Sequence, residues 1–309
     1  MFGESRQEAT MIPEQPTNKR RARLLGVVVG VVSMWSSAAN ADTESVSFGV
    51  NAYGSSGYCP GVALTHSIDD AQTFMAATRD QQGYDAYYVW TGLGADWEDF
   101  VEGSGDETSP SGTDWADVVF FSGHGAAAVC PGGGAPKFGK IVAGEPGPAN
   151  VCEIRVGGST SNVSLAAGGV NSDTNFLMLL SSRTLEFCAA NYGNINYWVD
   201  AGNSGTQQTL INGFHNSPLD EDHNDLEVFD YVANAGTEGI GDDWVDLLSS
   251  RGGFNSDCAV SSVVGYNTIT NDSLYFYGGF NDWHDTGVHQ SHWYYADCGH
   301  SYCSTIPGC

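Results

Sequence analysis

Two uninterrupted apolar runs constrain the fold of this chain more than any other feature. They are Asp117–Phe121 and Asn175–Leu180, and neither alternates apolar with polar positions. Such runs are typical of strands that are buried on both faces, which is the situation in parallel sheets. Each run ends in small polar residues. The pattern therefore predicts two central strands of a mainly parallel sheet.

Segments with strand and helix patterns alternate along the rest of the chain. The other predicted strands are residues 46–53, 84–91, 152–156, 209–215 and 259–266; the predicted helices are 67–80, 225–233, 242–248 and one that begins near Leu185. The first helix has Ser67 as its expected N-cap. Asp70 follows three residues later, where a carboxylate accepts hydrogen bonds from the free backbone amides. Alternating strands and helices imply an α/β fold with right-handed connections.

The N-terminus has the composition of a signal peptide. Basic residues between Lys19 and Arg23 precede the apolar stretch Leu24–Trp35, and Ala39–Ala41 fits the small-x-small cleavage pattern. The apolar stretch is shorter than the roughly 20 residues that span a bilayer, and no other stretch is long enough. We therefore expect residues 1–41 to be removed, and the remaining chain to be secreted or periplasmic with no membrane partner.

The charge balance excludes one class of partner. Acidic residues number 37 and basic residues 11, whereas phosphate binding needs clustered Lys and Arg. We therefore expect no nucleic-acid partner. An acidic surface favours solubility, and it also attracts cationic partners.

Cysteine usage indicates an oxidising compartment. The chain has eight cysteines, and an even number in an exported chain points to disulfides. One hypothesis pairs Cys130 with Cys152 across a Gly-rich segment, and another pairs two of the last three cysteines. The alternative for the C-terminal cysteines is a zinc site, which would use Cys298, His300 and Cys303.

Polar side chains follow three of the predicted strands. The segment Ser122–Gly125 ends the first apolar run, Ser181–Thr184 ends the second, and His215 ends a later strand. In α/β sheets, sites collect at the carboxyl ends of the strands. We therefore expect His124, Ser182 and His215 at one edge of the sheet.

The order apolar strand, Ser-Gly-His-Gly, apolar strand, Ser-Ser-Arg-Thr resembles the caspase-like peptidases, the group of caspases, legumains, gingipains and separases. In those enzymes a His-Gly pair ends one strand and a catalytic Cys ends the next; the His activates the thiol, and backbone amides hold the oxyanion. The resemblance implies a caspase-like three-layer α/β sandwich, a protein or peptide substrate and no cofactor. It makes His124 the base and the amide of Gly125 an oxyanion donor, with Gly123 lining the site.

The chain also resembles a family of secreted bacterial proteins of the same fold. The similarity lies between residues 46 and 250, and it is carried by four segments in this order: Trp97–Phe100, Asp114–Gly125, Leu179–Ser182 and Ile211–His215.

One position departs from the peptidase pattern. Ser182 stands where the nucleophilic Cys is expected, and a serine depends more strongly on its base and on the oxyanion donors. Three hypotheses remain open. Ser182 is a nucleophile that works with His124, or the domain is a catalytically inactive extracellular binding domain, or Cys188 is the nucleophile.

Neighbouring residues have both a functional and a structural interpretation. Arg183 either holds a substrate carboxylate or forms a salt bridge. His215 either lines the cleft or caps its strand. Glu98 and Asp99 either orient the imidazole of His124 or are surface acids.

The sequence also suggests how the chain is divided. The α/β domain covers residues 42–254, and a Gly- and Pro-rich, mostly irregular insertion occupies 126–173. Residues 255–309 form a Cys- and aromatic-rich extension, which we expect to be a disulfide-stapled cap on the same domain. The acidic loop Asp220–Asp225 is either a calcium site or a solvated loop, because calcium prefers several oxygen ligands.

Overall fold

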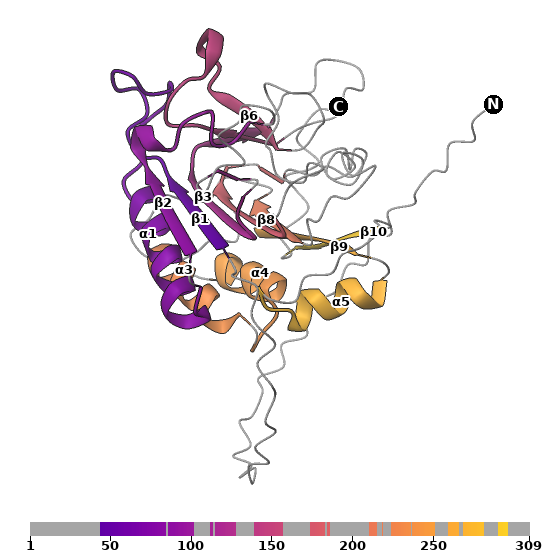
Figure 1. Ribbon diagram of the computed structural model, residues 1–309. Helices are drawn as coiled ribbons and strands as arrows, with labels where there is room; N and C mark the ends of the chain where they lie inside the picture. Colours follow the sequence, from indigo (N-terminus) through magenta and orange to yellow (C-terminus); the bar gives the residue numbers. More distant parts are fainter. Residues whose placement is uncertain are drawn as a thin grey trace, which may run out of the picture.

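The computed structural model describes the two central strands and most of the elements around them (Figure 1). The residues described are 44–84, 86–101, 112–113, 115–127, 139–156, 174–182, 184–185, 210–214, 218, 224–235, 237–250, 259–265, 268–280 and 290–295. They form an α/β structure around one mainly parallel sheet. This confirms the fold class that the alternating pattern predicts.

The main sheet has seven strands in the order β10-β9-β8-β7-β3-β1-β2. Their bounds are β1 Glu44–Gly49, β2 Ala86–Thr91, β3 Val118–Gly123, β7 Phe176–Ser181, β8 Leu210–Phe214, β9 Ala259–Gly265 and β10 Gln290–Tyr295. The strands from β2 to β8 in this order pair in parallel, whereas β9 is antiparallel to both of its neighbours. Every residue of β3 and β7 is buried, as expected for central strands covered on both faces.

Helices cover one face of this sheet (Figure 1). They are α1 Ser67–Ala77, α3 Asn224–Asn234, α4 Ile240–Ser250 and α5 Thr268–Tyr277. Phe74 of α1 stacks on Phe120 of β3 with ring centroids 4.6 Å apart, and Trp244 of α4 is fully buried against Phe214 of β8. These aromatic contacts hold the helix layer on the sheet, because such rings bury much apolar area.

The first helix begins differently from the prediction. Its N-cap is His66, which makes no side-chain capping bond, and Ser67 is already the first helical residue. Ser67 is also buried, because the backbone of β1 packs closely on the helix start. A Cβ on Gly49 would lie 2.5 Å from the carbonyl oxygen of Ser67. The helix continues past Ala77 into a π-helical turn, Thr78–Gln82.

The second face of the sheet is covered by irregular segments and a small antiparallel sheet. The small sheet has the order β4-β5-β6, with bounds β4 Gly125–Ala127, β5 Gly139–Val142 and β6 Glu153–Val156. Short 3-10 turns follow β2, at Gly92–Gly94, and join β5 to β6, at Pro148–Asn150. The buried residues Trp97, Phe100 and Ile141 belong to the core on this side.

The small sheet lies largely in the predicted insertion 126–173, which we expect to be mostly irregular with one strand at 152–156. Its described part contains β5, β6 and most of β4. Sequence patterns miss such strands because they are three or four residues long and lie among glycines. Ile141 and Ile154 nevertheless pair across β5 and β6 and are both fully buried. The predicted strand 152–156 is confirmed as β6.

The C-terminal extension is described only in part, and its cysteines lie outside the described residues, so the disulfide-stapled cap stays a prediction. Its described residues form β9, which confirms the predicted strand 259–266, then α5 and β10, and β10 pairs with β9 from Gln290 to Tyr295. This part of the extension therefore lengthens the main sheet. The pairing of β10 depends on cross-strand contacts with β9, so the aromatic composition of the tail alone could not predict it.

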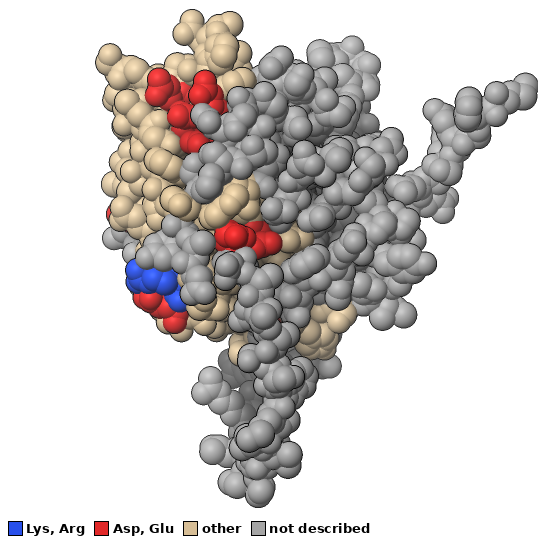
Figure 2. Space-filling model, viewed as in Figure 1, with Lys and Arg blue, Asp and Glu red and all other residues tan. Residues whose placement is uncertain are grey.

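Charged side chains are distributed unevenly on the surface. On the face drawn in Figure 2, acidic side chains form separate patches, and a single basic area lies directly beside an acidic one. Among the described residues, Arg79 pairs with Asp80, and Lys140 pairs with Glu153. No helix in the described part of the chain is long and apolar enough to cross a membrane.

Candidate functional site

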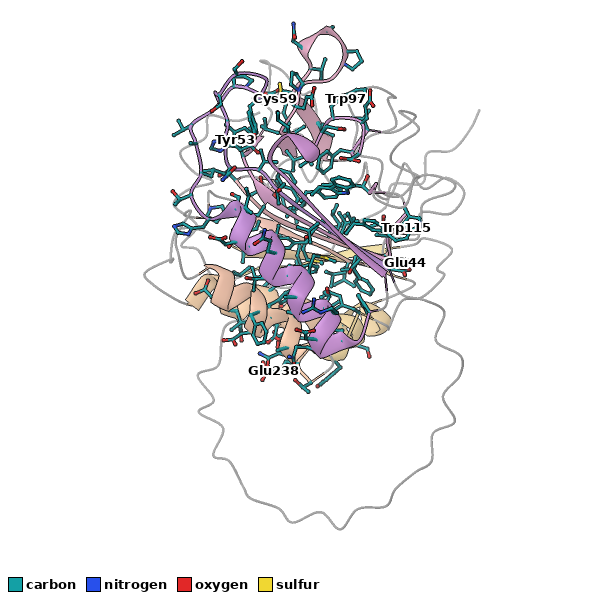
Figure 3. All side chains as sticks on the ribbon, turned by 60° about the vertical axis from the view of Figure 1, so that its left-hand side comes forward. Glu44, Tyr53, Cys59, Trp97, Trp115 and Glu238 are labelled. Carbon is teal, nitrogen blue, oxygen red and sulfur yellow. A yellow bond between two sulfur atoms is a disulfide. The ribbon has the colours of Figure 1, made fainter. Side chains whose placement is uncertain are left out.

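The strand order marks one end of the main sheet as the expected location of a site. The parallel strands have the order β2-β1-β3-β7-β8. β2 therefore lies on one side of β1, whereas β3 and the strands after it are added on the other side, and the strand order reverses between β1 and β3. In open α/β sheets, sites form at the carboxyl ends of the strands beside such a reversal. The loops that follow β1 and β3 therefore define the candidate site. Figure 3 shows Tyr53 and Cys59, in the loop after β1, far from Glu44, the first residue of β1.

The two strands with apolar runs end in register. β3 and β7 pair in parallel up to Gly123 and Ser181, so His124 and Ser182 are the next residues on neighbouring strands. This confirms that both follow the carboxyl ends of central strands. Ser182 is half-buried. His124 and Ser182 do not hydrogen-bond each other in the structure, and catalytic contacts are often long in the absence of substrate.

Gly125 brings two backbone segments into direct contact. A Cβ at this position would lie 2.4 Å from the carbonyl oxygen of Ser182 and 2.9 Å from its amide nitrogen. It would also lie 2.3 Å from the hydroxyl oxygen of Ser181. Only glycine allows this approach. The hydroxyl of Ser181 is buried and has no hydrogen-bond partner among the described residues.

The imidazole of His124 is held by a backbone carbonyl. Its Nε2 lies 2.6 Å from the carbonyl oxygen of Val62, in the loop between β1 and α1. A carbonyl oxygen only accepts hydrogen bonds, so Nε2 carries the proton. The neutral ring then has Nδ1 as its acceptor. Gly61 leaves room for this arrangement, since a Cβ there would lie 2.9 Å from Cδ2 of His124.

Tyr53 contacts both the ring and the backbone of His124. The two rings are tilted, with centroids 4.4 Å apart. The amide of His124 donates a 3.0 Å hydrogen bond to the Tyr53 hydroxyl, and this hydroxyl donates to the carbonyl of Val142 over 2.8 Å. Burial raises the pKa of Tyr53 far above its usual range, and the bond from the His124 amide only partly offsets this effect. The phenol is therefore neutral at physiological pH.

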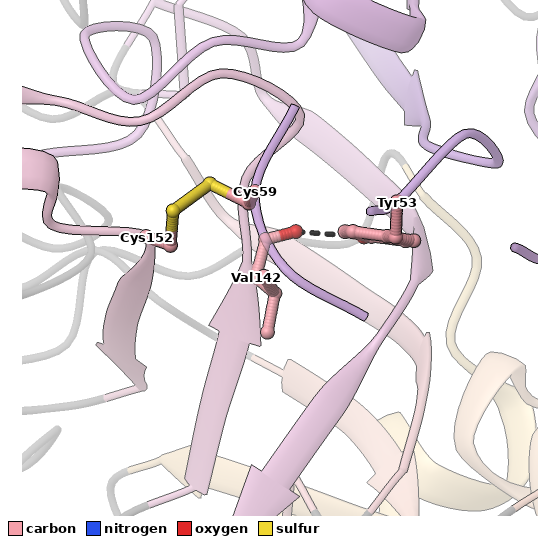
Figure 4. The surroundings of a disulfide bond; sticks show 4 residues. All are labelled: Tyr53, Cys59, Val142 and Cys152. Carbon is pink, nitrogen blue, oxygen red and sulfur yellow. Dashed lines mark hydrogen bonds between the residues drawn. A yellow bond between two sulfur atoms is a disulfide. The ribbon is translucent and has the colours of Figure 1, made fainter. Parts of the chain in front are cut away.

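A disulfide joins the loop after β1 to the small sheet (Figure 4). Cys59 and Cys152 are bonded, with their Cα atoms 5.6 Å apart and a sequence separation of 93 residues. The suggested pairing of Cys130 with Cys152 is therefore wrong. The backbone supports the disulfide from both sides, because the amide of Cys59 donates to the carbonyl of Gly144 and the amide of Ala143 donates to the carbonyl of Cys152.

A buried hydrogen bond supports the end of β3 from the helix side. The hydroxyl of Ser122 donates to Oδ2 of Asp70 over 2.8 Å. Asp70 lies in the first turn of α1, where the free amides favour a carboxylate. The residue that precedes Gly123 and His124 is thus fixed to the helix layer.

Glu98 and Asp99 do not orient the imidazole. The ring of His124 makes its hydrogen bond to Val62, and neither carboxylate bonds to it. Asp99 is not a surface acid either, because it is buried and accepts a hydrogen bond from the amide of Asp96. Glu98 is exposed.

Several predicted site residues lie outside the described part of the chain. They are Arg183, Cys188, His215, the C-terminal set Cys298, His300 and Cys303, and most of the loop 220–225. In the residues that the structure describes, no group of three or more His, Cys, Asp or Glu side chains is arranged to hold a metal ion.

The structure adds three residues that the sequence patterns did not reveal, namely Tyr53, Cys59 and Val62. Their contacts join segments that are far apart in the chain, such as Tyr53 and Val142, which are 89 residues apart. The sequence offered one signal for these residues, namely the long loop after the first strand. Loops that follow strands beside a reversal of strand order commonly form the site in α/β sheets. No protein-family model, curated protein or solved structure matches this chain significantly.

Proposed function

We propose that this chain is a secreted, caspase-like peptidase-type hydrolase in which His124 is the base and Ser182 is the nucleophile. The observation that carries the proposal is the 2.6 Å contact between Nε2 of His124 and the carbonyl oxygen of Val62. A catalytic base needs a third group that fixes its tautomer and orientation. Here the backbone carbonyl of Val62 is that group, and it lies in the loop after β1, next to the reversal of strand order between β1 and β3.

The register of β3 and β7 supports the choice of nucleophile. Gly123 and Ser181 form the last cross-strand pair, so the base and the proposed nucleophile follow on adjacent strands. The close contact between Gly125 and Ser182 brings their backbone amides into the same small region. Amides in such a place stabilise the negative oxygen that forms during acyl transfer.

The proposed reaction uses only groups of this chain and water. Nδ1 of His124 takes the proton of the Ser182 hydroxyl while Oγ attacks the scissile carbonyl carbon. The imidazolium then gives this proton to the leaving amine as the C–N bond breaks, which leaves an acyl-enzyme. Water, deprotonated by His124, hydrolyses the acyl-enzyme and restores the serine. The hydrogen bond to Val62 strengthens when the ring becomes charged, because charge-assisted bonds are stronger.

The disulfide supports the proposed location. A bond between Cys59 and Cys152 forms and persists in oxidising compartments, including the periplasm and the extracellular space. This agrees with the signal peptide predicted for residues 1–41.

A fluorophosphonate probe tests the nucleophile directly. It reacts with an activated serine by forming an Oγ–P bond and releasing fluoride, and mass spectrometry identifies the labelled residue. We expect Ser182 to be labelled, and we expect His124→Ala to slow labelling by about 100-fold or more, which is the usual contribution of a general base. Ser56→Ala is the matched control, because Ser56 is exposed in the loop after β1, and it should leave labelling unchanged.

A peptide library then tests turnover. Cleavage by the wild-type chain should disappear in Ser182→Ala, and Ser182→Cys should retain or raise it, because a thiol is the better nucleophile. If no variant cleaves any peptide and Ser182 is not labelled, the hydrolase proposal fails. If Cys188→Ala alone abolishes turnover, the nucleophile is wrongly assigned.

The second candidate function is a catalytically inactive binding domain of the same fold. It is favoured by the serine at the expected cysteine position and by the missing hydrogen bond between His124 and Ser182. This candidate predicts that peptides bind to the candidate site without cleavage. Binding that is unchanged in Ser182→Ala and weakened in His124→Ala, together with the absence of labelling, would support it.

A further inference from the structure

We propose that Tyr53 is a positioning residue, which fixes the imidazole of His124 in the orientation that the reaction needs. This inference rests on the proposed function. It concerns a residue outside the base and nucleophile, and it assigns a role to the loop between β1 and α1.

Three hydrogen bonds form a closed cycle around Tyr53. The amide of His124 donates to the Tyr53 hydroxyl over 3.0 Å, this hydroxyl donates to the Val142 carbonyl over 2.8 Å, and the Val142 amide donates to the His124 carbonyl over 2.9 Å. The cycle joins the loop after β1, the end of β3 and strand β5. Both backbone groups of His124 are used in it, so its backbone cannot rotate without breaking the cycle.

The side chain of His124 is fixed by the same loop. The Tyr53 ring lies against the imidazole, with centroids 4.4 Å apart. The backbone of Gly61 packs tightly against both residues, because a Cβ there would lie 2.9 Å from Cδ2 of His124 and 2.9 Å from Cβ of Tyr53. The carbonyl of Val62 then holds Nε2. Ring, backbone and Nε2 are thus all held by residues of one loop.

Two further features make this arrangement persistent. The Tyr53 hydroxyl stays protonated, because burial raises the pKa of Tyr53 far above its usual range, so it remains a donor to Val142. The Cys59–Cys152 disulfide connects the loop to the small sheet close to Val142 (Figure 4). A misplacement of about 1 Å in a catalytic group can cost about 100-fold in rate. We therefore expect the loss of the Tyr53 hydroxyl to slow the reaction of Ser182.

Tyr53→Phe tests the inference in the full chain, because it keeps the ring and removes both hydrogen bonds of the hydroxyl. The matched control is Tyr84→Phe. Tyr84 is also a buried tyrosine, but its hydroxyl has no hydrogen-bond partner among the described residues. Circular dichroism and thermal unfolding establish that both variants are folded.

The first measurement does not depend on activity. Nitrogen-15 NMR of the His124 ring reports its tautomer, and amide exchange reports the bond from its backbone. We expect a single Nε2–H tautomer and a slowly exchanging His124 amide in the wild type and in Tyr84→Phe. In Tyr53→Phe we expect the ring-nitrogen shifts to converge and the amide to exchange faster. Unchanged shifts and exchange in Tyr53→Phe would overturn the inference, and so would a rapidly exchanging amide in the wild type.

The second measurement is the rate at which a fluorophosphonate labels Ser182. We expect Tyr53→Phe to slow labelling by about 10- to 100-fold without weakening the binding of the probe. A change in binding with an unchanged maximal rate would contradict a positioning role. If the wild type is not labelled and no variant cleaves a peptide, the proposed hydrolase function fails, whereas the NMR result still decides whether Tyr53 fixes His124.

Discussion

The hydroxyl of Ser122 donates a 2.8 Å hydrogen bond to the carboxylate of Asp70 in the core between β3 and α1. Both side chains are almost completely buried, with Ser122 2% and Asp70 1% exposed. A buried carboxylate needs hydrogen-bond donors, since it has lost its hydration. The bond therefore fixes the start of α1 against the end of β3, two residues before His124.

Ser122→Ala should destabilise the fold. It removes a donor from a buried carboxylate, and leaving such a group less satisfied costs about 1–3 kcal/mol. Urea unfolding should show a lower midpoint with an unchanged slope, which indicates a change in stability alone. Ser56→Ala, at an exposed position, should not move the midpoint. If the two variants unfold at the same urea concentration, the bond contributes nothing to stability.

Gly61→Ala should displace the imidazole of His124. The new Cβ would lie 2.9 Å from Cδ2 of His124 and 2.9 Å from Cβ of Tyr53, and the end of the His124 side chain yields more easily than the Cβ of Tyr53. We expect the Nε2–H tautomer to lose its dominance in NMR spectra and labelling of Ser182 to slow by about 10-fold or more. Pro60→Ala, at an exposed position in the same loop, is the control, and it should behave like the wild type. A normal tautomer in Gly61→Ala would mean that the loop adapts without moving the ring.

Removal of the Cys59–Cys152 disulfide should destabilise the fold and loosen the site together. The bond closes a loop with a sequence separation of 93 residues, and loss of a native disulfide costs about 2–5 kcal/mol. We expect the double variant Cys59→Ser, Cys152→Ser to unfold at lower denaturant concentration and to exchange the His124 amide faster.

The matched control replaces only Cys130, which lies outside the described residues. Because Cys152 bonds to Cys59, Cys130→Ser should leave the Cys59–Cys152 peptide detectable by mass spectrometry after non-reducing digestion. If Cys130→Ser abolishes that cross-linked peptide, the pairing in solution differs from the Cys59–Cys152 pair of the structure.

The local patterns predicted the central strands but not the contacts that surround the site. β3 and β7 were evident because unbroken apolar runs have few alternatives to a strand buried on both faces. The positions of His124 and Ser182 followed from the ends of those strands. By contrast, the disulfide partner of Cys152 depends on a loop 93 residues away. The acceptor for the Tyr53 hydroxyl is likewise a backbone carbonyl, which carries no residue-specific signal.

A second group of carboxylates lies at the end of the molecule away from Tyr53, where Figure 3 labels Glu238. Asp243, in the first turn of α4, is 2% exposed. Burial, a hydrogen bond with Glu238 and the negative charges of Glu238, Asp242 and Asp246 together raise the pKa of Asp243 to about 8. These effects outweigh the helix N-terminus, which would lower the pKa of an acid in the first turn.

This shift predicts that the free energy of unfolding falls as the pH rises from about 4 to about 8. In an unfolded chain the carboxyl of Asp titrates near 3.9, so across this window the folded chain holds a proton that the unfolded chain has released. Stability therefore decreases with increasing pH. Asp243→Asn, which keeps the shape and removes the titration, should be close to the wild type near pH 4 and increasingly more stable towards pH 8.

Thermal unfolding of both proteins at pH 5 and pH 8 checks the Asp243 prediction. We expect the difference in melting temperature, variant minus wild type, to be larger at pH 8. Asp80→Asn is the control, because the hydrogen bond from Arg79 lowers the pKa of Asp80. Its folded and unfolded carboxyl groups are both ionised throughout this range, so its effect should be the same at both pH values. A pH-independent difference for Asp243→Asn would show that this carboxyl is already ionised in the folded chain at pH 5.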